Sequence, residues 1–196
     1  MDALKIVDQA IDELISEYPE KKNYYFRERE IHYIFFKKLS SLGELVHPEY
    51  PTRKRFKRIK NKKVEKQYIQ SIHCFDPDIK KGKRGSYDIV VLNPEFYNYY
   101  YDNIVRLSST KIDTNIHLNC KYIYIAIEFK YIKGTFDRLE VEYDLFKLKQ
   151  ANEVENKKLI IFTKRRPTDK NYDTMIKSLK EIKKNEHEIH IEIIED

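Results

Sequence analysis

One apolar segment constrains the fold of this chain more than any other feature. Residues 121–132, KYIYIAIEFKYI, are β-branched or aromatic for most of their length, which predicts a buried β-strand. Successive side chains of a strand alternate between its faces, so Ile127 and Phe129 point one way while Glu128 and Lys130 point the other. A carboxylate and an ammonium in so apolar a strand cost free energy unless they have partners. The segment therefore predicts a central strand that carries a charged site on one face.

The rest of the chain alternates between helical and extended patterns. From the spacing of apolar residues we expect helices at about 2–17, 23–42, 136–152 and 171–184, and further strands at about 44–52, 68–75, 86–92, 158–164 and 188–194. Pro19 should end the first helix and Gly43 the second, while Pro48 and Pro51 should confine the segment 44–52 to a sheet edge or strand end. This order predicts an α/β protein, with an α+β mixed sheet. The lack of repeats and of Gly/Ser linkers predicts a single domain over residues 1–196.

Composition argues against several classes of protein. No apolar run approaches the roughly 18 residues of a membrane span, and the acidic, amphipathic N-terminus is unlike a secretory signal. Cys74 and Cys120 are too few for a disulfide framework or a zinc cluster, so we expect a cytoplasmic protein. The four glycines form no GxGxxG or Walker-type motif. His187 and His190 are expected at the surface, and His73 has no further metal ligands near it in sequence.

Positive charge is concentrated in one stretch of the chain. Residues 53–66, RKRFKRIKNKKVEK, hold nine basic residues and one acidic residue, which gives this segment a charge of +8. The whole chain has a net charge of +6, so the other residues sum to −2. Such a patch attracts polyanions, above all nucleic acid. The candidate contacts are Arg53, Lys54, Arg55, Lys57, Arg58, Lys60, Lys62 and Lys63, with Lys83 and Arg84 from a second basic run. The alternative is a solvated, lysine-rich loop.

Two further acids accompany Glu128 and Lys130. Asp88 lies near the start of the predicted strand 86–92, and two adjacent strands could bring Asp88 and Glu128 to one cation. Glu28 falls in the apolar stripe of the second helix, with Tyr24, Ile31, Phe35 and Leu39, whereas Glu30 is rotated by roughly 200° toward solvent. We expect Glu28 to face the same cleft. The alternative is a plain internal salt bridge, Glu128 with Lys130 or with an arginine.

Other polar residues have simpler interpretations. Asp137 and Asp144, on the helix that follows the central strand, are expected to pair with neighbouring lysines rather than to bind metal. Glu49 lies near a strand end, where it could support the site, and the sequence does not decide this. Tyrosines at 97, 99, 100 and 101 could stack on bases. We favour their packing against the core or lining a homodimer contact.

Together these residues resemble the PD-(D/E)xK nuclease superfamily, which has the restriction-endonuclease-like fold. The resemblance spans about residues 24–165 and is carried by Glu28 in FRERE, Asp88 in GSYDIVVL and Glu128-Phe129-Lys130 in AIEFK. It implies a core of helix, three strands, helix and strand, with an N-terminal helix and a C-terminal helix-strand extension. The forty residues between Asp88 and Glu128 imply an insertion, assigned to the tyrosine-rich segment 95–120, and Tyr87 stands in the place of the proline of the motif name.

The resemblance also implies a chemistry. Asp88, Glu128 and the backbone carbonyl of Phe129 would bind Mg²⁺ or Mn²⁺, and Lys130 would orient the attacking water or stabilise charge on the phosphate. Glu28 would hold a metal-bound water or a second ion. The basic run would contact the nucleic-acid backbone, most readily that of DNA, with RNA not excluded. The expected function is thus a magnesium-dependent nuclease, an endonuclease, that hydrolyses phosphodiester bonds.

Two other classes of function remain open at this stage. One is a non-catalytic nucleic-acid-binding module that keeps the fold, although such a module has no need of all four polar residues. The other is an interaction subunit of a larger complex, with the tyrosine-rich insertion as its contact surface.

Overall fold

The described residues form an α/β structure around one mixed sheet. The computed structural model describes residues 2–24, 27–60, 67–73, 83–97, 121–134, 136–166 and 170–196, and for residues 51, 53–60, 67–73 and 83–84 it describes the backbone alone. The helical elements are α1 (Ala3–Lys21), α2 (Glu28–Lys38), the 3-10 helix η1 (Ser40–Leu45), α4 (Arg138–Lys149) and α5 (Tyr172–Asn185). The strands are β1 (Val46–Lys60), β2 (Gln67–His73), β3 (Lys83–Leu92), β4 (Ile123–Lys133), β5 (Val154–Lys164) and β6 (His190–Ile194). No helix within these ranges is long and apolar enough to cross a membrane.

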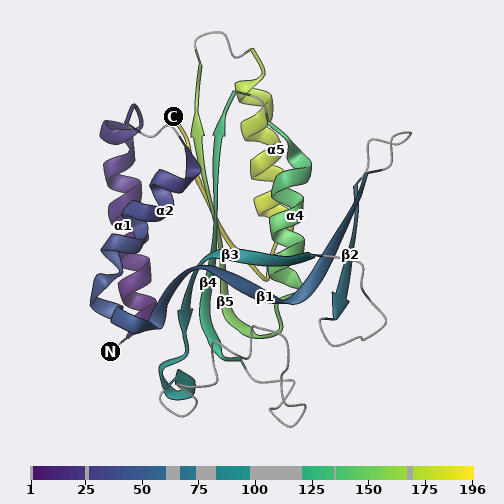
Figure 1. Ribbon diagram of the computed structural model, residues 1–196. Coiled ribbons are helices and arrows are strands. Elements are labelled where there is room, and N and C mark those ends of the chain that lie inside the picture. Colours follow the sequence, from purple (N-terminus) through teal and green to yellow (C-terminus); the bar gives the residue numbers. More distant parts are fainter. Residues whose placement is uncertain are drawn as a thin grey trace.

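The sheet has six strands in the order β2-β1-β3-β4-β5-β6. The pairs from β2 to β4 are antiparallel, whereas β4, β5 and β6 run parallel. Helices α1 and α2 cover one face and α4 and α5 cover the other, as Figure 1 shows. This agrees with the α/β class and mixed sheet that the sequence predicts.

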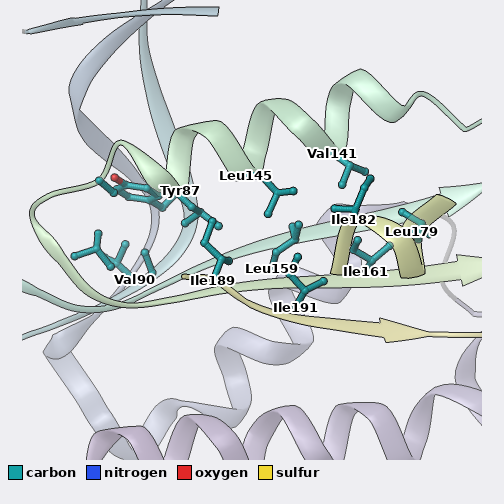
Figure 2. Close-up of a cluster of buried hydrophobic side chains, with 14 of the residues drawn as sticks. Tyr87, Val90, Val141, Leu145, Leu159, Ile161, Leu179, Ile182, Ile189 and Ile191 are labelled. Atoms are coloured by element: carbon teal, nitrogen blue, oxygen red, sulfur yellow. The ribbon is translucent and has the colours of Figure 1, made fainter. Parts of the chain in front are cut away.

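Each face of the sheet has its own hydrophobic core. Ile125, Ile127 and Phe129 of β4 pack with α1 and α2, as their alternation predicts. On the other face, Val141 and Leu145 of α4 lie over residues of β3, β5, α5 and β6 (Figure 2). The buried residues Ile31, Phe35 and Leu39 confirm most of the predicted stripe on the second helix.

The helix boundaries differ from the predicted ones. Helix α1 continues through Pro19 to Lys21, because buried Tyr18 anchors its last turn by donating a hydrogen bond to the carbonyl of Thr163 (2.8 Å). Helix α2 begins at Glu28 rather than near residue 23, so Tyr24 lies outside it and is 75% exposed. This start is fixed where the carboxylate of Glu30 accepts the backbone N–H of Arg27 (3.1 Å). The helix also ends early, at Lys38, and Gly43 with φ of 54° lies instead within η1.

The basic run is partly a strand rather than a loop. Residues 54–60 of β1 pair with β2, whereas Pro48 and Pro51 lie in the first half of β1, which pairs with β3. Within the described part of the sheet that half therefore has a strand on one side, as the two prolines predict. The pairing Arg55↔Arg84 places the two predicted basic runs on neighbouring strands.

Strands β3 and β4 separate at the point that matters most for function. Their pairing runs from Leu92↔Ile123 to Ile89↔Ile127 and ends there, although both strands continue. Strand β3 instead stays paired with β1, and the two run together across the sheet, away from β4 (Figure 1). The next residues of the pair are Asp88 and Glu128, so both acids lie where the sheet opens.

Candidate active site

Two carboxylates replace the strand partner that β4 loses at this opening. The backbone N–H of Phe129 donates to Asp88 Oδ2 (2.7 Å), and the N–H of Tyr131 donates to Glu28 Oε2 (2.9 Å). Without β3 beside them, these partly buried amides need acceptors, since an unpaired backbone N–H away from water is costly. The two amides are about 7 Å apart along the strand. The edge of β4 therefore holds Asp88 and Glu28 side by side, from two different elements.

A chain of ion pairs connects the other charged residues with helix α4. Lys147 Nζ lies 2.7 Å from Glu128 Oε1 and 3.4 Å from Asp144 Oδ1, and it donates to the carbonyl of Ser86 (2.7 Å). Lys130 Nζ lies 2.9 Å from Asp144 Oδ2 and 3.9 Å from Glu28 Oε1. Glu128, Asp144 and Lys147 are all buried. The alternation prediction is confirmed, because Glu128 and Lys130 both reach α4.

The site carries more negative than positive charge. Glu28, Asp88, Glu128 and Asp144 supply four carboxylates, against the two ammonium groups of Lys130 and Lys147, which leaves two negative charges when all are ionised. An excess of this size inside a protein must be offset by protons or by a bound cation.

The pKa shifts reflect this shortage of positive charge. Burial raises the pKa of Asp88 to about 6 and raises the pKa values of Glu128 and Glu28 as well. Burial disfavours the charged forms of both lysines, but the neighbouring carboxylates outweigh it and raise the pKa values of Lys130 and Lys147. Acids and bases alike therefore hold protons more firmly than usual. A cation placed among the carboxylates would relieve the same deficit.

His32 is a site residue that the sequence analysis missed. Its Nε2 lies 3.5 Å from Asp88 Oδ2, and its ring packs against Phe129 with centroids 5.3 Å apart. Burial lowers the pKa of His32. Glu28, His32 and Asp88 each offer a ligand atom, and these atoms all lie within 4.8 Å of one another. The sequence feature that could have revealed His32 is its spacing of four residues from Glu28, which places both side chains on the same face of the helix.

The structure thus brings the predicted residues Glu28, Asp88, Glu128 and Lys130 to one place. The salt bridge considered as the alternative has different partners, since Glu128 pairs with Lys147 and Lys130 pairs with Asp144. Asp144 pairs with lysines, as expected. Among the described residues Asp137 pairs with no lysine and instead caps α4 by accepting the backbone N–H of Leu139 (2.9 Å).

Glu49 stands across from Asp88 on the neighbouring strand. It falls between the pairs Pro48↔Ile89 and Tyr50↔Tyr87, and it has a φ of 51°, which is uncommon for a residue other than glycine. Its Oε2 accepts a hydrogen bond from Ser86 Oγ (3.0 Å), and its charge favours the protonated form of His32. Glu49 therefore borders the site without belonging to the ion-pair chain.

A pocket of about 380 Å³ opens beside Glu28 and Lys130. Arg27, Lys133 and Arg166 contribute cations to its lining. Gly134, with φ of 88°, leaves room for the guanidinium of Arg166, because a Cβ at that position would lie 2.9 Å from Arg166 Cζ. These cations would attract a polyanion to the pocket beside Glu28 and Lys130.

Several predicted contacts fall outside what the structure describes. Lys62 and Lys63, and most of the segment 95–120 with the tyrosines at 99–101, lie outside the described residues, as do Cys74 and Cys120. For Arg53, Lys54, Arg55, Lys57, Arg58, Lys60, Lys83 and Arg84 the backbone is placed in strands and the side chains are not described. Tyr97 donates a hydrogen bond to Glu44 Oε2 (2.8 Å).

No protein-family model, no curated protein and no solved structure matches this chain. The function of this protein must therefore be inferred from the geometry of the site.

Proposed function

We propose that this protein is a metal-dependent nuclease that hydrolyses phosphodiester bonds of DNA, with a PD-(D/E)xK-type site. The observation that carries the proposal is the gathering of Glu28, Asp88, Glu128 and Lys130 where β3 and β4 separate, at a site with two more carboxylates than ammonium groups. Carboxylates at an opening in a sheet offer a divalent cation oxygen ligands and a path for substrate.

The order of elements supports the proposal. Helix α2, strands β1, β3 and β4, helix α4 and strand β5 occur in the order of the nuclease-like core, with η1 and β2 inserted between them, α1 before them, and α5 and β6 after them. Asp88 and Glu128 lie on the adjacent strands β3 and β4, and Glu28 lies at the start of α2. Because a fold does not fix a function, the site itself carries the argument.

The residues present fit a divalent ion. Asp88 and Glu128 would hold it, and the carbonyl of Phe129 would contribute because the N–H and C=O of one residue of a strand point to the same edge, here toward Asp88. Glu128 Oε1 is buried and lies 2.7 Å from Lys147 Nζ, and because an ionised carboxylate has about four lone-pair sites, Glu128 keeps some of them for such an ion. When bound, the ion would supply charge neutralisation and an acidified water.

Lys130 acts in this scheme as a cation rather than as a base. The carboxylates of Asp144 and Glu28 raise its pKa against the effect of burial, so it stays protonated at neutral pH. A protonated ammonium can donate hydrogen bonds to a phosphate oxygen or to the attacking water. Asp144 positions it, since Asp144 Oδ2 lies 2.9 Å from Lys130 Nζ. Glu28, near the same ammonium, would hold a water or a second ion.

The basic run would hold the substrate. Arg55 and Arg84 are paired across β1 and β3, and these strands lead from Asp88 toward the run. Cations spread along two neighbouring strands suit the repeated charge of a nucleic-acid backbone, which binds without regard to sequence.

One observation favours a second candidate, a non-catalytic nucleic-acid-binding module. Lys147 lies 2.7 Å from Glu128 Oε1 and so occupies the place beside that carboxylate where a metal ion would bind. In a module without catalysis the lysine would serve permanently in place of the ion. It offsets only part of the charge, however, and the excess on Asp88 and Glu28 remains.

A cleavage assay across substrates tests the proposal. The full chain, stripped of metal with chelator, is incubated with supercoiled plasmid, linear duplex, single-stranded DNA and RNA, with Mg²⁺, Mn²⁺ or no ion. We expect cleavage of DNA with either ion added back and none in chelator. Binding without cleavage of any substrate under all conditions would overturn the nuclease and favour the module.

A further inference from the structure

The packing of the His32 ring against Phe129 does not account for its Nε2. Its Nε2 is buried and forms no hydrogen bond with any residue that the structure describes, although Asp88 Oδ2 is only 3.5 Å away. A buried polar nitrogen without a partner costs free energy, and most such atoms in folded proteins are satisfied. The ring lies between α2 and Phe129, so the nitrogen faces the carboxylates rather than solvent. A group from outside the chain would complete its bonding.

The geometry around His32 suits one metal ion. The ligand atoms of Glu28, His32 and Asp88 all lie within 4.8 Å of one another. Ligand atoms about 2.1 Å from an octahedral ion are about 3 Å apart when adjacent and about 4.2 Å apart when opposite. At most one of the three pairs can be opposite, so binding one ion would bring the other pairs to about 3 Å through rotation of the side chains.

The donor set discriminates between metals. Mg²⁺ prefers oxygen ligands and keeps several bound waters, so an imidazole nitrogen adds little to its binding affinity. First-row transition ions accept imidazole readily, and Mn²⁺ among them also suits carboxylates and octahedral geometry. One imidazole beside two carboxylates is thus better matched to Mn²⁺ than a set of carboxylates alone.

We propose that Glu28, His32 and Asp88 form a nitrogen-containing site that binds Mn²⁺ in preference to Mg²⁺. The inference rests on the proposed nuclease for what the ion does, while the binding itself is independent of cleavage. Asp88 would be shared between this ion and the ligands on β4, and His32 would be a metal ligand that sets which ion the site selects.

Spectroscopy of bound Mn²⁺ tests the assignment directly. Metal-free full-length protein is titrated with Mn²⁺, with the free ion followed by electron paramagnetic resonance and the bound ion examined by electron spin echo modulation for coupling to ¹⁴N. We expect ¹⁴N coupling in the wild type and its loss in His32→Gln, with Mn²⁺ affinity lower by at least about tenfold. Mg²⁺, measured by competition with Mn²⁺, should lose far less affinity in the variant.

A matched variant and the cleavage assay separate the outcomes. His187→Gln removes an exposed histidine between α5 and β6 and should leave both the coupling and the affinity unchanged. Bound Mn²⁺ without ¹⁴N coupling in the wild type, or coupling that persists in His32→Gln, would overturn the assignment, and the first of these needs no folded variant. If ¹⁴N coupling from His32 is present but no nucleic acid is cleaved, the metal site stands and the nuclease fails. If Mg²⁺ and Mn²⁺ support cleavage equally and His32→Gln changes neither binding nor coupling, the nuclease stands and this inference fails.

Discussion

Lys147 is the residue whose loss should disturb the charge balance of the site most. It is buried and contacts Glu128, Asp144 and the carbonyl of Ser86, at 2.7, 3.4 and 2.7 Å. Lys147→Met keeps the length of the side chain and the helix propensity but removes the charge. Breaking a buried ion pair by removing one partner costs about 3–5 kcal/mol, because the other charge is left in the interior. We therefore expect the free energy of unfolding of the metal-free protein to fall by about that amount.

Urea denaturation followed by circular dichroism measures this loss, and the same helix supplies a control. Lys149 is exposed, and its partner Glu186 still accepts the backbone N–H groups of His187 and Glu188 when the lysine is removed, so Lys149→Met should cost less than Lys147→Met. Added Mn²⁺ should recover more stability in Lys147→Met than in the wild type, because the orphaned carboxylates then attract the ion more strongly. If Lys147→Met cost no more than Lys149→Met, Lys147 would not be neutralising buried charge, and the reasoning about the site would be wrong.

Three further predictions concern pH, substrate binding and the pocket. The pKa of Asp88 is raised from 3.8 to about 6, so the unfolded chain releases this proton at a lower pH than the folded protein does. The metal-free protein should therefore lose up to about 3 kcal/mol of its free energy of unfolding between pH 4 and 6. Urea denaturation of Asp88→Asn at the same pH values should lack this contribution. Replacing Arg53, Arg55, Arg58 and Lys60 with Ser should weaken DNA binding broadly and flatten the log–log salt dependence by about 0.9 for each phosphate that the protein no longer neutralises, whereas the same number of exposed lysines replaced on α5 should leave the slope unchanged. Gly134→Ala should cost about 1 kcal/mol or more in thermal unfolding, since φ is 88° and the new Cβ would meet the guanidinium of Arg166; an unchanged melting temperature would contradict this.

The sequence predicts well what depends on local periodicity. The period of two in β4 places Ile125, Ile127 and Phe129 in one core and Glu128 on the opposite face, because alternation is a property of the extended backbone itself. The period of 3.6 likewise predicts the burial of Ile31 in α2. These features need no knowledge of distant contacts.

The partners of the charged residues could not be predicted in this way. Glu128 pairs with Lys147 of α4, a contact that depends on how the helix crosses the sheet and leaves no local pattern in sequence. The separation of β3 from β4 also leaves no pattern in the sequence, since residues 86–92 have the composition of one continuous strand. Because the strands separate there, the carboxylate of Asp88 can accept a hydrogen bond from the backbone N–H of Phe129, which offsets the cost of burying an acid in a sheet.

Cleavage and binding measured on the same variants test the nuclease most directly. Asp88→Ala and Glu128→Ala should abolish Mg²⁺- or Mn²⁺-dependent cleavage of DNA, and both should still bind DNA at least as tightly as the wild type, because negative charge near the phosphates has been removed. Asp12→Ala, which removes an exposed acid of α1, should leave both properties unchanged. Cleavage that persists in Asp88→Ala, or that continues in chelator, would contradict a metal-dependent nuclease at this site.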